Sequence, residues 1–132
     1  MKVIIIEDET PAANRLAKLL QAAGDEIDVV AKLDSVAAAV HYFQSSPQPD
    51  LIFMDIQLAD GLSFDIFLQV QITAPVIFTT AFDQYTLKAF KVNSIDYLLK
   101  PIDETELIKA VEKYRQLYVI DEHDFSEKIL KA

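Results

Sequence analysis

Acidic side chains stand directly after two of the apolar runs in this sequence. Glu7 and Asp8 follow a run rich in β-branched residues, and Asp55 follows four consecutive apolar residues. Carboxylates brought together repel one another, and protonation or a cation relieves that repulsion. Mg²⁺ prefers oxygen ligands and commonly takes one or two carboxylates together with a phosphate oxygen. A carboxylate beside such a cation, Asp55 for example, could attack a phosphoryl group and form an acyl phosphate.

Two further polar residues close apolar runs later in the chain, Thr80 and Lys100. The ammonium group of Lys100 could offset charge on phosphoryl oxygens, and the Thr80 hydroxyl could donate a hydrogen bond to one of them. Each residue also has an ordinary explanation when taken alone. Asp55 could form a turn, Thr80 is a common strand residue, and Lys100 could be a solvated charge. The joint occurrence of the acids, Thr80 and Lys100 favours the chemical interpretation.

Apolar segments that predict strands alternate with segments that have helical spacing. The strands are predicted over 2–6, 27–31, 51–55, 76–80 and 95–99, and the helices over 11–23, 36–44, 62–70, 83–92 and 104–118. This alternation predicts an α/β fold, a three-layer sandwich with a flavodoxin-like five-stranded parallel sheet in the order 2-1-3-4-5 and five helices. In that order the first and third strands are neighbours, so Glu7, Asp8 and Asp55 should meet in one crevice.

Local signals set several helix boundaries and inner faces. Thr10 is predicted as the N-cap of the first helix, with Pro11 as its first residue and Gly24 as its end. In the third helix the residues predicted to face inward are Phe64, Phe67 and Leu68. Asp103 and Glu106 resemble a capping box before the last helix, whose predicted inner stripe is Leu107, Val111, Tyr114 and Tyr118.

Composition limits the possible function classes. The 132 residues suit a single domain, and the absence of Cys excludes disulfides, thiolate catalysis and Cys-bound zinc. With 21 acidic and 12 basic residues the net charge is −9, so this chain alone is not expected to bind DNA. No stretch approaches the ~18 consecutive apolar residues of a membrane span, so we expect a cytoplasmic protein with no membrane partner.

Several short motifs, in this order and at the ends of the predicted strands, carry a family resemblance: Glu7-Asp8, Asp55, Thr80-Ala81, Tyr97 and Lys100-Pro101. Together they resemble the receiver domain of two-component response regulators, over about residues 1–118. The resemblance implies that Asp55 accepts a phosphoryl group from a sensor histidine kinase or a small phosphodonor. Residues 119–132 are then a C-terminal tail or a linker toward an output domain.

The same resemblance implies a metal site and a phosphoryl partner. Asp8, Asp55 and the backbone carbonyl of Gln57 would bind Mg²⁺, with Mn²⁺ as a possible substitute, and Glu7 would act through water. Lys100 would pair with the phosphoryl group, and the peptide bond before Pro101 would be cis, which only a minority of X-Pro bonds are.

A switch is also implied, with Thr80 and Tyr97 as its residues. Thr80 would move toward the phosphoryl group, and Tyr97 would turn inward into the vacated space. The surface of the fourth helix, fifth strand and fifth helix would then change and form a homodimer or dock a partner. Because Phe82 is bulky and apolar, we expect it to restrict water and slow hydrolysis of the acyl phosphate.

The sequence of the second half, at 78–82, 89–90 and 95–101, is similar to that of receivers that precede a LytTR-type DNA-binding domain. No such domain occurs in these 132 residues. We therefore expect an excised receiver rather than a natural single-domain protein, which would reach DNA and control transcription only through a domain absent from this chain.

Two other classes compete with a signalling module. A Mg²⁺-dependent aspartyl phosphatase of the haloacid dehalogenase type normally needs a second acid two residues after the nucleophile, where this chain has Gln57. A receiver-like interaction module without phosphorylation would lack an acid, the Thr or the Lys, and none is missing. We expect no enzyme beyond intrinsic Mg²⁺-dependent autophosphorylation from small donors and autodephosphorylation.

Overall fold

The computed structural model describes residues 1–81 and 94–118, and its centre is a parallel sheet. The strands are β1 (Lys2–Ile6), β2 (Asp28–Leu33), β3 (Leu51–Asp55), β6 (Val76–Thr80) and β7 (Ser94–Leu99). They pair in the order β2-β1-β3-β6-β7, and each of these pairs is parallel. This is the predicted 2-1-3-4-5 order, so the flavodoxin-like arrangement is confirmed.

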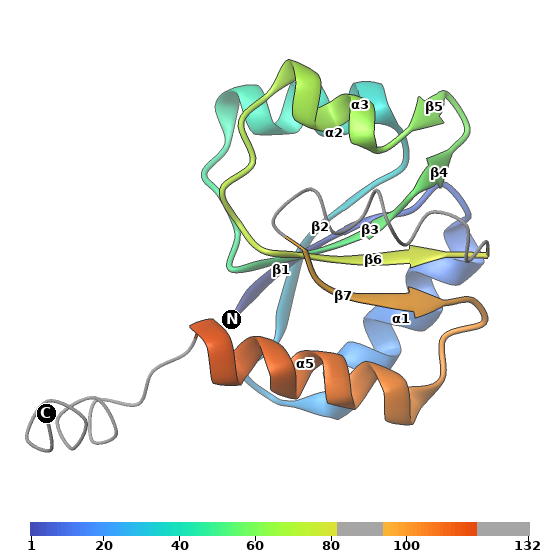
Figure 1. Ribbon diagram of the computed structural model, residues 1–132, viewed down its shortest axis with the longest axis vertical. Helices are drawn as coiled ribbons and strands as arrows, with labels where there is room; N and C mark the ends of the chain where they lie inside the picture. The colour runs from blue at the N-terminus through green and yellow to red at the C-terminus, as the bar shows by residue number, and fades with distance from the viewer. Residues whose placement is uncertain (82–93, 119–132) are drawn as a thin grey trace, which may run out of the picture.

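Helices cover both faces of the sheet (Figure 1). One layer holds α1 (Thr10–Ala23) and α5 (Glu104–Tyr118), and the other holds α2 (Val36–Ser45) and α3 (Phe64–Gln69). The helix predicted over 83–92 lies outside the described residues. The three-layer sandwich is therefore confirmed, with four helices in the part of the chain that the structure describes.

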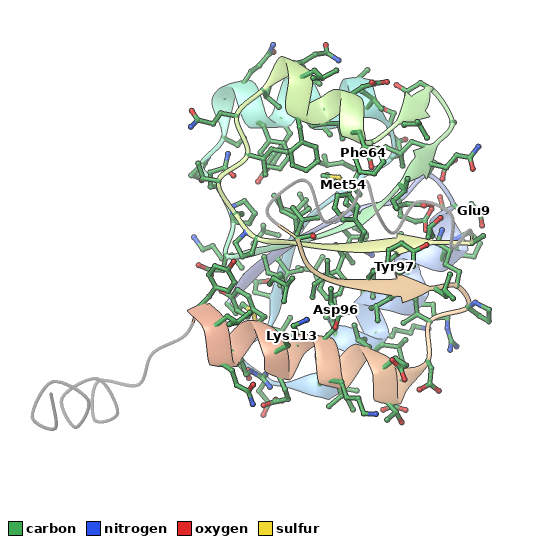
Figure 2. All side chains as sticks on the ribbon, in the orientation of Figure 1. Glu9, Met54, Phe64, Asp96, Tyr97 and Lys113 are labelled. Atoms are coloured by element: carbon green, nitrogen blue, oxygen red, sulfur yellow. The ribbon has the colours of Figure 1, made fainter. Side chains whose placement is uncertain are left out.

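Alternate residues of the central strands feed two separate cores. In β1, Ile5 packs on the α1 and α5 side, whereas Ile4 packs on the α2 and α3 side. In β3, Phe53 and Met54 divide in the same way, and Figure 2 shows Met54 and Phe64 on the α2 and α3 side of the sheet. Strands buried on both faces read as continuous apolar runs, which is the pattern that the sequence carries.

The start of α1 differs from the prediction. The helix begins at Thr10, and its N-cap is Glu9, whose side chain makes no capping hydrogen bond. The prediction of Thr10 as the N-cap was therefore wrong. Pro11 is tolerated one position further in because the first four backbone N–H groups of a helix have no partner within it. Gly24 ends the helix as predicted. Strand β2 runs on to Leu33, beyond the predicted 27–31, because Leu33 still pairs with Ile6 of β1.

The segment between β3 and α3 contains a hairpin that the sequence did not predict. Strands β4 (Gln57–Leu58) and β5 (Gly61–Leu62) pair antiparallel, which takes Leu62 out of the predicted helix and leaves α3 with six residues. Ile66 is the buried residue of α3, while Leu68 is 84% exposed, so its predicted inward orientation was wrong. Two residues along a helix is about 200°, which places Leu68 opposite Ile66.

Helix α5 follows its predicted start closely. Asp103 accepts hydrogen bonds from the backbone N–H groups of Glu106, at 3.1 Å, and Leu107, at 2.9 Å. The buried stripe of the helix is Leu107, Ala110, Val111 and Tyr114. Tyr118 is 45% exposed and stacks on Tyr114 with ring centroids 5.6 Å apart, so its placement in the inner stripe was wrong.

Candidate functional site

Three carboxylates meet at the carboxyl ends of neighbouring strands. Glu7 and Asp8 follow β1, Asp55 ends β3, and these two strands pair in parallel. One carboxylate oxygen of each residue lies within 4.8 Å of those of the other two. Glu7 and Asp55 are only 7% and 5% exposed, and Asp8 is half-buried. This carboxylate cluster, Glu7, Asp8 and Asp55, occupies the crevice that the predicted strand order required.

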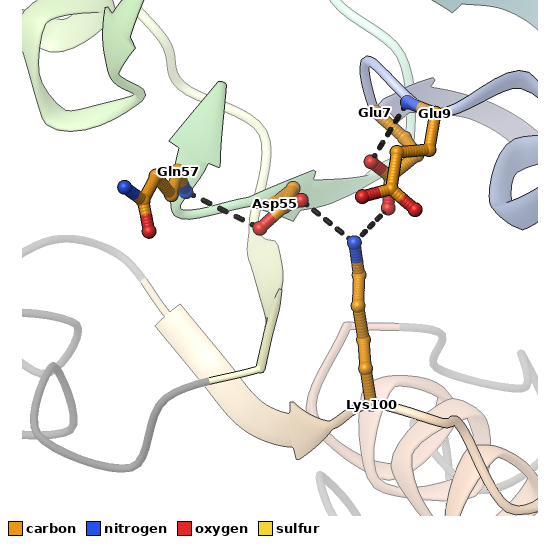
Figure 3. A network of polar contacts seen from close by, with 5 residues as sticks. All are labelled: Glu7, Glu9, Asp55, Gln57 and Lys100. Atoms are coloured by element: carbon orange, nitrogen blue, oxygen red, sulfur yellow. Dashed lines mark hydrogen bonds and ion pairs between the residues drawn. The ribbon is translucent and has the colours of Figure 1, made fainter. Parts of the chain in front are cut away.

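Lys100 reaches the carboxylate cluster from the end of β7 (Figure 3). Its Nζ lies 2.7 Å from Oδ2 of Asp55 and forms a second ion pair with Glu7. The Lys100 backbone N–H donates to the carbonyl of Thr80 at 2.8 Å, which fixes the base of this side chain beside β6. The Lys100–Pro101 peptide bond is cis, as the family resemblance implied. One ammonium group therefore bridges two buried carboxylates.

Backbone N–H groups hold the other oxygens of the two carboxylates. Oδ1 of Asp55 accepts from the N–H of Gln57 at 3.2 Å, and Oε2 of Glu7 accepts from the N–H of Glu9 at 3.2 Å (Figure 3). Each carboxylate is thus fixed between a backbone donor and Lys100. Such hydrogen bonds orient a carboxylate and favour its charged form.

Burial dominates the ionisation of Glu7. It raises the pKa of the Glu7 carboxyl to about 7, and the nearby charge of Asp55 adds to this, while hydrogen bonds from Lys100 and Glu9 act in the opposite direction. Burial alone would lower the pKa of Lys100, but its bonds to Asp55 and Glu7 outweigh this and raise it. Lys100 is therefore a permanent cation at neutral pH, whereas Glu7 titrates there.

The Glu7 titration predicts a pH-dependent stability in the absence of metal. Between the ordinary pKa of 4.5 and about 7, the folded protein keeps a proton on Glu7 that the unfolded chain has lost. The stabilisation linked to Glu7 is thus complete below the lower value and is lost as the pH rises through the higher one. We expect the free energy of unfolding of the wild type, relative to Glu7→Gln, to fall as the pH rises from about 4.5 to about 7.

Urea unfolding of both proteins in the presence of a chelator measures this difference. Glu7→Gln keeps the size and hydrogen-bonding ability of the side chain but cannot titrate, so it is the matched control. A difference between the two proteins that stays constant across this pH range would contradict the raised pKa of Glu7.

The carboxylate cluster opens onto a cavity of about 310 Å³. The cavity brings together five of the residues that the sequence nominated: Asp8, Asp55, Gln57, Thr80 and Lys100. Thr80 is fully buried at the end of β6. Glu7 lines an adjoining cavity of about 380 Å³, which lies between α1 and the segment around Pro101. A phosphoryl-sized group in the first cavity would meet Asp55 and Lys100 together.

Tyr97 does not line this cavity. Tyr97 lies half-buried on the α2 and α3 side of β7 (Figure 2) and lines a separate cavity of about 270 Å³ near the start of α5. It pairs with Phe78 of β6, two residues before Thr80, so the two proposed switch residues occupy adjacent strands. Phe82 lies outside the described residues, and so does the fourth-helix part of the predicted dimer surface.

Sequence reasoning missed two features of the site. The ion pair between Glu7 and Lys100 depends on how far a lysine side chain reaches across β6 and β3, which no local pattern encodes. The β4–β5 hairpin did have a signal, because an Asp-Gly dipeptide such as Asp60-Gly61 is typical of hairpins.

The donor set suits a hard divalent cation. All three members of the carboxylate cluster offer oxygen ligands, which Mg²⁺ prefers and Mn²⁺ also accepts. The observed spacing would let one cation contact several of these oxygens and relieve their mutual repulsion.

The helices within 1–81 and 94–118 include none with the length and apolar character of a membrane-spanning segment.

Comparison with known sequences agrees with this geometry. The sequence model of the response regulator receiver domain matches residues 3–112. Sensory transduction protein LytT of Bacillus cereus is 37% identical over 119 residues, which are 88% of this chain and 48% of that protein. Transcriptional regulatory protein BtsR of Escherichia coli is 38% identical over 121 residues, again 88% of this chain and 48% of the relative. This chain thus spans about half the length of these relatives.

Solved structures also share the fold. The response regulatory domain of protein mrkE from Klebsiella pneumoniae superposes with a TM-score of 0.76 at 30% identity, over 88% of this chain and 96% of that one. The N-terminal domain of a response regulator/sensory box/GGDEF 3-domain protein from Carboxydothermus hydrogenoformans gives a TM-score of 0.75 at 32% identity, over 89% and 96% of the two chains.

Proposed function

This chain belongs to the response regulator receiver domain family, and from that membership we propose that Asp55 is its phosphoacceptor. The observation that carries the proposal is the position of Asp55. It ends β3, is 5% exposed, and contacts Lys100 at 2.7 Å in a cavity that also holds Asp8. An aspartate that only formed a turn would need neither a partly buried cation nor a second carboxylate beside it.

The reaction is a displacement at phosphorus. A carboxylate oxygen of Asp55 forms the new bond to phosphorus while the bond to the leaving group breaks, and the electron pair departs with that group. The leaving group is the histidine imidazole of a sensor kinase or the acetate of acetyl phosphate. The ammonium group of Lys100 offsets charge on the transferring oxygens, and the hydroxyl of Thr80 donates to one of them.

Asp8, Asp55 and the backbone carbonyl of Gln57 would hold Mg²⁺, with Glu7 acting through water and Mn²⁺ as a substitute. Bound there, the cation supplies positive charge against the phosphoryl oxygens. The chain's own part is to arrange the carboxylates beforehand, and the N–H of Gln57 on Asp55 contributes to this.

The downstream consequences belong to the same proposal. Phosphorylation shifts Thr80 and Tyr97 and changes the surface of β7, α5 and the segment over 83–92. The chain then forms a homodimer through this surface. Residues 1–118 are the receiver, and 119–132 lead toward an output domain of LytTR type that binds DNA and controls transcription. We also propose a cytoplasmic location, because the partner kinase would deliver phosphoryl groups in the cytoplasm.

A signalling module fits this chain better than a phosphatase. Gln57, two residues after Asp55, is an amide and cannot act as the second acid of a haloacid dehalogenase-type enzyme. We therefore propose only slow autophosphorylation from small donors and autodephosphorylation.

Intact mass spectrometry tests the proposal. The chain is incubated with phosphoramidate or acetyl phosphate, with Mg²⁺ or with a chelator. We expect a labile gain of about 80 Da that requires Mg²⁺ and is absent from Asp55→Asn. An equal gain in the chelator, or in the variant, would contradict it.

A further inference from the structure

The β4–β5 hairpin links the phosphoacceptor strand to the N-terminus of a distant helix. Its first residue, Gln57, donates its N–H to Asp55, and its tip carries Asp60. Oδ1 of Asp60 accepts from the N–H of Val36 at 2.8 Å, and Oδ2 accepts from that of Ala37 at 3.1 Å. Val36 and Ala37 are the first two residues of α2. A single exposed carboxylate therefore ties the hairpin to a helix more than twenty residues away in sequence.

Two side chains accept hydrogen bonds from backbone N–H groups in the first turn of α2. Ser35, the N-cap, accepts from Ala38 at 3.0 Å, whereas Asp60 accepts from Val36 and Ala37. Those backbone hydrogen bonds lower the pKa of Asp60, so its carboxylate stays charged where the helix dipole favours a negative charge. Ser35 caps the helix from within its own segment, and Asp60 caps it from the hairpin.

The hairpin needs such an external tie because its own pairing is short. Each strand has two residues, and an isolated two-stranded hairpin of any length is marginal in water. Gly61 has a φ of +145°, a conformation that L side chains rarely adopt, so the turn depends on glycine. Leu58, 5% exposed in the α2 and α3 core, anchors one strand, and Asp60 anchors the tip.

We propose that Asp60 is a positioning residue for the phosphorylation site. By fixing the hairpin tip to α2, it holds the main chain of Gln57 against Asp55, so that the carboxylate and the adjacent backbone are arranged before the cation and the phosphodonor arrive. This inference rests on the proposed Mg²⁺-dependent function of Asp55. Without the Asp60 contact the hairpin is free to move. Part of the free energy of Mg²⁺ binding must then be used to order the site.

A matched set of variants in the full chain separates positioning from simple helix capping. Asp60→Ala removes the tie, and Ser35→Ala removes a cap from the same helix end without touching the hairpin. Asp60→Asn keeps one acceptor oxygen and is the conservative variant. The readouts are the Mg²⁺ dissociation constant by calorimetry and the amide hydrogen exchange of Gln57 in metal-free protein.

We expect Asp60→Ala to bind Mg²⁺ about tenfold more weakly than the wild type, with Ser35→Ala within about twofold of it. The Gln57 amide should exchange faster in Asp60→Ala than in Ser35→Ala, and Asp60→Asn should fall between the wild type and Asp60→Ala in both readouts. Equal effects of Asp60→Ala and Ser35→Ala in both readouts would overturn the positioning role. A wild type that binds no Mg²⁺ would instead overturn the proposed function, and the exchange data would still test the tie.

Discussion

We expect Asp8→Asn to slow Mg²⁺-dependent phosphorylation of the chain roughly 100-fold or more. The substitution replaces one carboxylate of the cluster by a neutral amide and leaves Asp55 and Lys100 in place. Stabilisation of transition-state charge by a bound metal contributes several kcal/mol, and about 3 kcal/mol corresponds to a factor of more than 100 in rate. The rate is measured by intact mass over time, with phosphoramidate at a fixed Mg²⁺ concentration.

Asp34→Asn is the matched control for this experiment. Asp34 follows the neighbouring strand β2, is exposed, and stands outside the carboxylate cluster, so the same chemical change there should leave the rate near that of the wild type. High Mg²⁺ concentrations should partly restore Asp8→Asn, because the defect lies in metal affinity. A rate in Asp8→Asn that equals that of the control would remove Asp8 from the proposed site.

We expect Ile66→Ala to lower the free energy of unfolding by about 2–5 kcal/mol, while Leu68→Ala changes it by less than about 0.5 kcal/mol. Both residues lie on α3, and both changes truncate a four-carbon side chain to a methyl group. Ile66 is fully buried in the α2 and α3 core, whereas Leu68 is 84% exposed. Truncating Ile66 leaves a cavity in this core, whereas truncating Leu68 removes atoms that already contact water.

Urea denaturation of the two variants measures both values. Domains of this size have only about 5–15 kcal/mol of stability, so Ile66→Val, with an expected cost of about 0.5–1.5 kcal/mol, provides a second measurement if the alanine variant does not fold. Comparable losses in Ile66→Ala and Leu68→Ala would show that α3 is rotated relative to the structure described above.

The central sheet was predictable because its signal is local and repeated. Runs such as Leu51 to Asp55 are buried on both faces, and the polar residue that ends each run must lie at one edge of a parallel sheet. That reasoning places Glu7, Asp8 and Asp55 together from the sequence alone. The same logic brings Thr80 and Lys100 to the same edge, and the cavity beside Asp55 contains both.

The segment after Asp55 could not be predicted with equal success, because its structure depends on distant partners. Leu62 pairs with Gln57 across the hairpin instead of joining α3, and the hairpin is tied down by the Asp60 contact with α2. Apolar spacing alone could not orient Leu68, since a helix of six residues makes fewer than two turns and offers little periodicity. The contact between Glu7 and Lys100 could not be predicted either, because these residues are far apart in sequence and meet only in the folded sheet.

The measurement that tests the central claim most directly is the location of the phosphoryl group. Borohydride reduces an aspartyl phosphate to homoserine, which peptide mass mapping assigns to a single position after Mg²⁺-dependent phosphorylation. The proposed function predicts homoserine at position 55 in the phosphorylated wild type, and none in Asp55→Asn or in a sample kept in a chelator. Homoserine at position 8 or at any other aspartate, with Asp55 unchanged, would contradict the assignment of Asp55 as the phosphoacceptor.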